Sequence, residues 1–216
     1  MTLLVRSFVR AADADQFAGE LAAVRGAHVA ALATTTLEVP TATEAELRDH
    51  ARITARVHRQ AASLPARFGV HYETQNALAR AIGANERRLA RELDEVGLRN
   101  ELSIILSWRS ARPRSGNAGS RAATSGREYL LARAASEREK QEAESLVARL
   151  VAVLAGDRAV IRQFICPRDG VAATVAVLTT REGETAVRER ADRFARETDE
   201  VTVAVYGPMP PYSFVS

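Results

Sequence analysis

The last eleven residues, YGPMPPYSFVS (Tyr206–Ser216), hold three prolines and three aromatic side chains. Chain ends usually fray because few contacts hold them, so this composition predicts a terminus that packs against a surface. The stretch before it, VTVAVY (Val201–Tyr206), is apolar at nearly every position, which predicts a central strand. Gly207 and Pro208 end that strand, because proline cannot continue a strand ladder.

Beyond the strand, the adjacent prolines Pro210 and Pro211 predict an extended path. Tyr212 and Phe214 alternate with Ser213, the pattern of an extended segment that buries one face. Burying each aromatic ring stabilises docking by about 2 kcal/mol. The tail either docks on the protein's own fold, as a further strand or across to another domain, or binds a partner. The stretch PMPP also matches the PxxP pattern of polyproline recognition, a weaker alternative.

A segment rich in Arg, Ser and Gly divides the 216 residues into two parts of similar length. Residues 109–127 contain five arginines and no acid, and they account for the net charge of +3. We predict a flexible linker at 109–126 between an N-terminal α+β domain at 1–108 and a C-terminal domain at 127–216. A nucleic-acid-binding protein more often carries its charge as a basic stripe on a folded face. Binding of nucleic acid or anionic lipid by the linker is a remaining alternative.

The chain has the composition of a globular protein without membrane segments. No apolar run approaches the roughly 20 residues of a membrane-spanning helix. The N-terminal apolar stretch is too short for a signal peptide. A single cysteine, Cys166, excludes an internal disulfide, and we expect it to be buried as a small hydrophobic side chain. We therefore expect a soluble, cytoplasmic protein.

The hydrophobic spacing of the first domain predicts the order β-α-β-α-β-α-β. Asp13 is a candidate cap for the first helix, and Thr43 with Glu46 forms a capping box for the second. The expected elements are strand Leu3–Val9, helix Asp15–Arg25, strand His28–Val39, helix Glu44–Ala62, strand Leu64–Glu73, helix Gln75–Glu95 and strand Glu101–Trp108.

The hydrophobic spacing of the second domain predicts the order α-β-β-α-β. This order fits a ferredoxin-like α+β fold if one more strand completes the sheet, and the tail is the candidate for that strand. The expected elements are helix Arg127–Ala155, strand Ala159–Cys166, a turn at Pro167–Gly170, strand Val171–Thr179, helix Glu184–Glu197 and strand Glu200–Tyr206.

The sequence contains no pattern typical of catalysis. Its four histidines have no thiolate or carboxylate at ligand spacing, so we expect no metal site. Phosphate-binding glycine loops and the GxSxG and HExxH motifs are absent. We therefore expect a protein without enzymatic activity and without a cofactor.

The stretch LPARFG (Leu64–Gly69) places an arginine inside an apolar strand. In one interpretation, the stem of Arg67 packs at a sheet edge while its charged head reaches water. In the other, Arg67 forms a buried charge-assisted hydrogen bond or contacts a partner.

Three stretches together resemble the gas vesicle accessory family GvpL/GvpF. YGPMPPYSFV (Tyr206–Val215) is similar to that family's GPWPPYSFV ending, with Met209 in place of tryptophan. LPARFG is similar to its LPLRFGT, which follows a helix that carries a histidine, here HARITARVHR (His50–Arg59). SGREYLLAR (Ser125–Arg133) is similar to its G-x-x-YL segment. The matches occur in the family's order and span nearly the whole chain.

The resemblance implies a non-catalytic α+β protein of two domains, with a ferredoxin-like C-terminal domain extended by the tail. It implies a cytoplasmic role in gas vesicle nucleation and assembly, with the small hydrophobic shell protein and other accessory proteins as partners and neither nucleic acid nor membrane. We expect the LPARFG strand or the tail to offer a sheet edge to the shell protein. A small-ligand-binding or enzymatic protein is the alternative. The residues expected to bind a partner or dock the tail are Arg67, Phe68, Gly69, Tyr206, Pro208, Pro210, Pro211, Tyr212 and Phe214.

Overall fold

The computed structural model describes four stretches of the chain, which are residues 1–110, 126–155, 159–165 and 170–215. Most of the expected linker therefore lies outside the described residues. The same holds for Cys166 and for most of the expected turn that follows it.

The described chain forms two compact units, and the chain passes between them twice. One unit consists of Met1–Glu101 together with Met209–Ser216, and the other of Leu102–Pro208. This division differs from the expected one at 108 and 127 in two ways. The strand that ends at Trp108 belongs with the second unit, and the tail belongs with the first.

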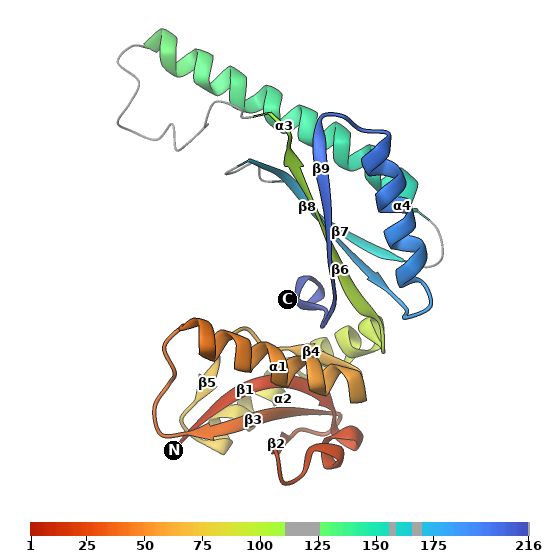
Figure 1. The fold of residues 1–216 in the computed structure, drawn as a ribbon. Coiled ribbons are helices and arrows are strands. Elements are labelled where there is room, and N and C mark those ends of the chain that lie inside the picture. The colour runs from red at the N-terminus through yellow and green to blue at the C-terminus, as the bar shows by residue number, and fades with distance from the viewer. Residues whose placement is uncertain (111–125, 156–158, 166–169, 216) are drawn as a thin grey trace. The chain divides into compact units, whose positions relative to one another are not determined.

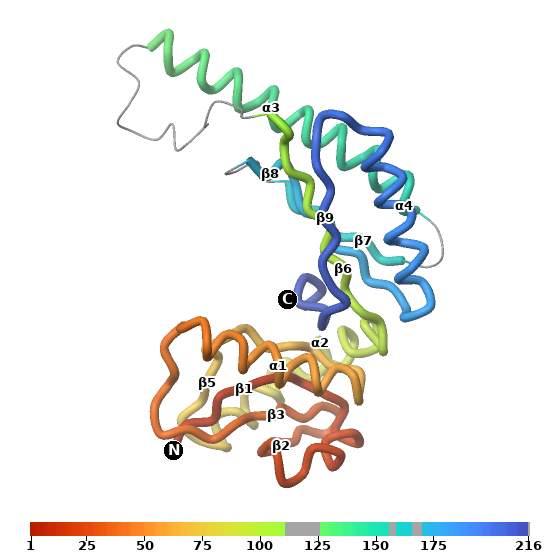
Figure 2. The backbone as a smooth tube through the Cα atoms, viewed as in Figure 1, coloured from red at the N-terminus to blue at the C-terminus, as the bar shows by residue number. Residues whose placement is uncertain are grey.

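The first unit is built on an antiparallel sheet in the order β2-β3-β1-β4, with β5 also paired to β1. Figures 1 and 2 show β1 and β3 running through the middle of this unit. Pairing of β1 with β3 places Val9 opposite Ala30 and Thr2 opposite Thr36, with one register shift between Val5 and Ser7. The strands are β1 (Thr2–Arg10), β2 (Ala22–Arg25), β3 (Val29–Thr36), β4 (Ser63–Pro65) and β5 (His71–Tyr72).

Two helices accompany this sheet, as expected, and a threonine caps each of them. Helix α1 (Glu44–Gln60) begins after Thr43, whose side chain accepts a hydrogen bond from the Glu46 amide, which confirms the predicted cap. Helix α2 (Gln75–Val96) begins after Thr74, which caps it in the same way.

The two helices pack on opposite faces of the sheet. Val9, Ala30 and Leu32 join a core cluster with residues of α1. Phe8, the neighbour of Val9 in β1, instead lines a pocket with residues of α2, as the alternation of side chains along a strand requires.

The expected helix at Asp15–Arg25 is wrong. A 3-10 helix, η1 (Ala11–Phe17), and strand β2 occupy this stretch. Gly19 has φ of 87° and interrupts the apolar spacing that suggested a helix. The second half of the segment pairs with β3, and this stabilising contact with a distant strand cannot be recognised from the local sequence pattern.

The expected strand at Leu64–Glu73 is interrupted. Its two ends, β4 and β5, both pair with β1, and a loop connects them. Pro65 lacks an amide hydrogen, and Gly69 has φ of 85°, a conformation that favours glycine. The chain therefore leaves the sheet at this point and returns to the same strand.

The second unit has the element order β-α-β-β-α-β around a sheet in the order β7-β8-β6-β9. The expected strand at Glu101–Trp108 is β6, which lies between β8 and β9 in this sheet. The elements are β6 (Asn100–Trp108), α3 (Gly126–Leu154), β7 (Val160–Phe164), β8 (Val171–Thr179), α4 (Glu184–Arg196) and β9 (Val201–Met209).

Helices α3 and α4 cover the same face of this sheet (Figure 1). Leu146 and Leu150 of α3 share one core cluster with Phe194 of α4 and with strand residues such as Ile104 and Val175. The N-terminal part of α3 extends beyond that core and is solvent-exposed. Among the described residues, none of the helices combines the length and the apolarity that crossing a membrane requires.

Candidate partner-binding site

The LPARFG stretch forms a loop whose two ends are fixed to β1. The Ala66 amide donates to the carbonyl of Arg6 at 2.9 Å, and the Val5 amide donates to the carbonyl of Val70 at 2.9 Å. Between these anchors Arg67 is exposed and Phe68 is half-buried. No hydrogen bond or ion pair joins the Arg67 guanidinium to the described residues, so the structure favours the interpretation that its head reaches water.

The neighbouring strand β4 does not offer an open sheet edge. Ser63 and Leu64 are completely buried, and Pro65 and Ala66 are buried as well. An incoming strand needs exposed backbone groups to pair with. The burial of these residues therefore does not support the expected pairing of a partner strand with the LPARFG edge.

The buried side chain of His50 on α1 contacts this loop. The His50 Nε2 lies 2.9 Å from the carbonyl of Ala66, and the Nδ1 lies 3.2 Å from the Arg6 guanidinium. Since a carbonyl only accepts and a guanidinium only donates, Nε2 carries the proton and Nδ1 accepts. The Phe68 ring meets the His50 ring edge-on, with centroids 5.6 Å apart. The imidazole thus fixes both the backbone and the aromatic side chain of the loop.

Burial lowers the pKa of His50, and the charge of Arg6 adds to this effect. Burial also lowers the pKa of Arg6, although the Asp49 carboxylate, 3.6 Å from its Nη2, opposes that change. Arg6 additionally donates from Nε to the Thr34 hydroxyl at 3.0 Å. A neutral imidazole beside a paired guanidinium is the arrangement that these contacts favour.

The C-terminal tail forms a turn rather than the expected extended segment. The Tyr212 amide donates to the Pro210 carbonyl at 2.8 Å, and the Phe214 amide donates to the Pro211 carbonyl at 3.0 Å. The second bond spans three residues, the spacing of a 3-10 helix, and this helix is η2 (Tyr212–Phe214). Its turn directs the aromatic residues apart, so that Phe214 is 4% exposed and Tyr212 is 36% exposed. A fixed proline φ is compatible with either path, which is why the sequence did not distinguish them.

Side-chain hydrogen bonds and burial hold the tail in the first unit. The Tyr212 hydroxyl lies 2.6 Å from the Thr54 hydroxyl on α1. Glu101, which is 2% exposed, accepts from the Ser213 amide at 2.8 Å and from the Ser213 hydroxyl at 2.7 Å. Pro210 and Pro211 are buried beside Phe214.

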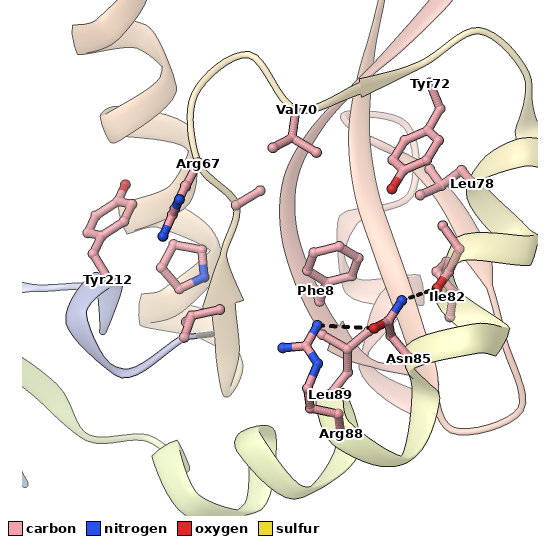
Figure 3. A pocket seen from close by; sticks show the side chains of 14 residues that line it. Phe8, Arg67, Val70, Tyr72, Leu78, Ile82, Asn85, Arg88, Leu89 and Tyr212 are labelled. Carbon is pink, nitrogen blue, oxygen red and sulfur yellow. Dashed lines mark hydrogen bonds between the residues drawn. The ribbon is translucent and has the colours of Figure 1, made fainter.

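The loop, the tail, β1 and α2 together enclose a pocket of about 350 Å³. Figure 3 shows Arg67 and Tyr212 on one side of it and Tyr72 and Leu78 on the other. The remaining lining residues are mainly apolar, and they are Phe8, Pro65, Ala66, Val70, Ala81, Ile82, Asn85, Arg88, Leu89 and Val215.

The predicted site residues fall into two groups. Tyr206 and Pro208 are exposed on β9, and both belong to the second unit. There Arg188 of α4 holds the strand end by donating to the Gly207 carbonyl at 2.6 Å. The first unit contains the others, which are Arg67, Phe68, Gly69, Pro210, Pro211, Tyr212 and Phe214.

Sequence reasoning missed the residues that hold this site together. Arg6 and Glu101 read as strand residues, and only their burial shows that they bind other segments. His50 stood out only as the histidine of the helix before LPARFG. His58 is likewise buried, with Nε2 3.0 Å from the Arg99 carbonyl. In the described stretches, His, Cys, Asp and Glu nowhere gather in a group of three that fits a metal ion.

Comparison with known proteins identifies the fold and then the family. A crystal structure of the gas vesicle protein GvpF from Anabaena sp. PCC7120 matches with a TM-score of 0.74 and 12% identity over 100% of this chain and 96% of that one. The GvpF structure from Microcystis aeruginosa matches with a TM-score of 0.70 and 15% identity over 100% and 98% of the two chains. No curated protein sequence matches significantly.

The fold is thus an α+β fold with two antiparallel sheets, shared with these GvpF structures. Residues 9–216 match the family described as gas vesicle synthesis protein GvpL/GvpF. The chain belongs to the GvpL/GvpF family, which supports a role as a gas vesicle accessory protein.

Proposed function

We propose that this chain is a non-enzymatic accessory protein that binds the small hydrophobic shell protein and supports gas vesicle nucleation and assembly. The match of residues 9–216 to the gas vesicle synthesis family carries this proposal. We place the protein in the cytoplasm and at the forming vesicle, with no role in binding nucleic acid or membrane.

The first unit supplies a surface that suits such a partner. Arg67 of its loop and Tyr212 of its tail line a mainly apolar pocket, and the half-buried Phe68 belongs to the same loop. Aromatic residues and arginine are the types enriched at protein interfaces. Arg67, Phe68 and Tyr212 are therefore the proposed contacts, and Gly69, Pro210, Pro211 and Phe214 shape the loop and the docked tail.

The second unit is, in this proposal, a ferredoxin-like domain. Its β-α-β-β-α-β order and its sheet order β7-β8-β6-β9 support that assignment. Strand β6 supplies the additional strand that the sequence order lacked, and the tail is not needed to complete the sheet.

Other accessory proteins are proposed partners of the exposed half of α3. Tyr129, Leu130 and Leu131 are 42%, 65% and 61% exposed near its start. These apolar side chains occupy consecutive exposed positions of the helix, and large exposed apolar side chains are a feature of protein-binding surfaces. Tyr206 and Pro208, exposed on β9, offer a second contact surface in the same unit.

Co-purification tests the central part of the proposal. The tagged chain is co-expressed with the cognate shell protein, and the shell protein recovered in the soluble eluate is quantified against an unrelated tagged protein. We expect specific recovery in a fixed ratio. If the shell protein stays in the pellet and the chain elutes alone, direct binding is excluded.

A small-ligand-binding protein is the competing candidate, because the pocket reaches the lower end of the size range of ligand sites, about 300–1,000 Å³. A saturable increase in melting temperature with a metabolite, in a chain that does not recover shell protein, would favour that candidate.

A further inference from the structure

The pocket of the first unit has an apolar interior. Leu78, Ile82 and Leu89 come from α2, and all three are almost fully buried. Phe8 of β1 and Val70 of the loop line the same space and are half-buried. Apolar side chains make up most of this lining, so an apolar group that enters the pocket is stabilised by leaving water.

The two arginines that line the pocket differ in their hydrogen bonding to the rest of the described chain. Arg88 donates to Glu92 at 2.9 Å and to Asn85 at 3.5 Å, so it is held within α2 (Figure 3). Arg67 is exposed, and no hydrogen bond or ion pair to the described residues occupies it. The pocket thus combines an apolar interior with one available guanidinium, which binds carboxylates through charge-assisted hydrogen bonds.

The surroundings of the pocket indicate a protein segment as its occupant. The volume of about 350 Å³ lies at the lower end of the range of small-molecule sites, about 300–1,000 Å³. Tyr212, which lines the pocket on the same side as Arg67, is 36% exposed, so its surface continues outside the pocket (Figure 3). A segment of chain covers both the interior and this exposed margin, whereas a small molecule covers only the interior.

We infer that this pocket binds a segment of the partner protein that presents a large apolar side chain beside a carboxylate. The apolar side chain occupies the space between Phe8 and α2, and the carboxylate pairs with Arg67. The inference rests on the proposed binding of the shell protein and assigns that binding to a site. The tail takes part because Tyr212 and Val215 form one wall.

Two pairs of substitutions on and near α2 test this site in the co-purification assay. Ala81 lines the pocket, and Ala81→Phe fills it, whereas Ala84→Phe adds the same ring to an exposed position on the same helix. Arg67→Gln removes the pocket charge, and Arg80→Gln removes an exposed charge outside the pocket. Circular dichroism and melting verify the fold, and Ala81→Leu replaces Ala81→Phe if the latter is unfolded.

We expect Ala81→Phe to reduce shell-protein recovery about tenfold or more, in line with the loss of a central interface contact. Arg67→Gln should reduce the recovery of shell protein several-fold. Added salt should reduce the difference in recovery between this variant and the unsubstituted chain. Both control variants should recover shell protein as the unsubstituted chain does.

The possible failures are distinguishable. If the unsubstituted chain recovers no shell protein, the proposed function and the site assignment fall together. If it recovers shell protein and the folded Ala81→Phe variant recovers as much, only the site assignment is overturned. If sodium octanoate also raises the melting temperature of that unsubstituted chain saturably while Ala81→Phe leaves recovery unchanged, the pocket belongs to a small carboxylic acid instead.

Discussion

The carboxylate of Glu101 accepts two hydrogen bonds from Ser213, one from its amide at 2.8 Å and one from its hydroxyl at 2.7 Å. Glu101 is 2% exposed, and a buried carboxylate is stable only when hydrogen bonds replace its lost water. The start of β6 and the end of the chain, 112 residues apart, therefore stabilise each other. This pair explains why the C-terminal tail is ordered in the first unit.

Ser213→Ala removes the hydroxyl donor and leaves Glu101 Oε1 without that bond. We expect a loss of about 1–3 kcal/mol in the free energy of unfolding, the usual cost of an unsatisfied buried charged acceptor. Urea unfolding measures this value, and carboxypeptidase digestion should show faster removal of the tail. Ser136→Ala, at an exposed position of α3, serves as the control. A change below about 0.5 kcal/mol for Ser213→Ala would contradict the pairing.

The hydroxyls of Tyr212 and Thr54 provide a second measurable contact. Thr54 lies 3.0 Å from the His50 carbonyl, to which it donates, so Tyr212 is the donor between the two hydroxyls. Tyr212→Phe should cost about 0.5–1.5 kcal/mol. A double-mutant cycle with Thr54→Val should give a coupling energy of similar size, whereas Tyr206→Phe, exposed on β9, should change little. A coupling energy near zero argues against the contact.

Stability should decrease as the pH falls below about 6.5, the ordinary pKa of histidine. Burial lowers the pKa of both His50 and His58 in the folded chain, so the unfolded chain binds more protons in this range. The stability that neutral His50 and His58 contribute is fully present above their pKa in the unfolded chain. It is lost as the pH falls through their lowered pKa values in the folded chain. Urea unfolding between pH 7 and pH 5 measures the slope, before most carboxylates titrate.

Substitution identifies the source of that slope. His50→Gln should flatten the dependence of unfolding free energy on pH, and His58 should account for the remainder. An unaltered slope in a folded His50→Gln/His58→Gln variant would show that other groups cause the pH dependence.

Two glycines in the first unit should respond to alanine with opposite sign. Gly69 has φ of 85° in the LPARFG loop, so Gly69→Ala should cost about 1–2 kcal/mol. Gly83 lies within α2 with nothing within 4 Å of an added Cβ, so Gly83→Ala should stabilise by about 0.5–1 kcal/mol. Thermal unfolding of both variants measures the difference. Equal effects of the two substitutions would contradict the assigned loop conformation.

Elements with local signals could be predicted closely from the sequence. Helix α2 was expected at Gln75–Glu95 and spans Gln75–Val96, because its apolar spacing is contained within the helix. Strand β8 has the expected bounds, Val171–Thr179. These segments carry enough information within their own length to define their structure.

The errors arise where distant segments decide the outcome. The segment Asp15–Arg25 has helical spacing, but its second half forms β2 because β3 offers a pairing partner. Strand β6 was recognised as a strand, yet its place between β8 and β9 follows from pairing that the local pattern does not encode. Arg67 and Tyr212 could be singled out from the sequence. The pocket residues contributed by α2 could not, because only the folded chain brings them beside the loop and the tail.

The most direct test of the central claim is sedimentation of purified, labelled shell protein after dilution from denaturant into increasing concentrations of this chain. We predict that the shell protein shifts saturably into the supernatant, at a fixed ratio to the chain, and that about tenfold more of the Ala81→Phe variant is needed for the same effect. Sedimentation of the shell protein at every concentration of the folded chain would contradict the claim that this family member binds it.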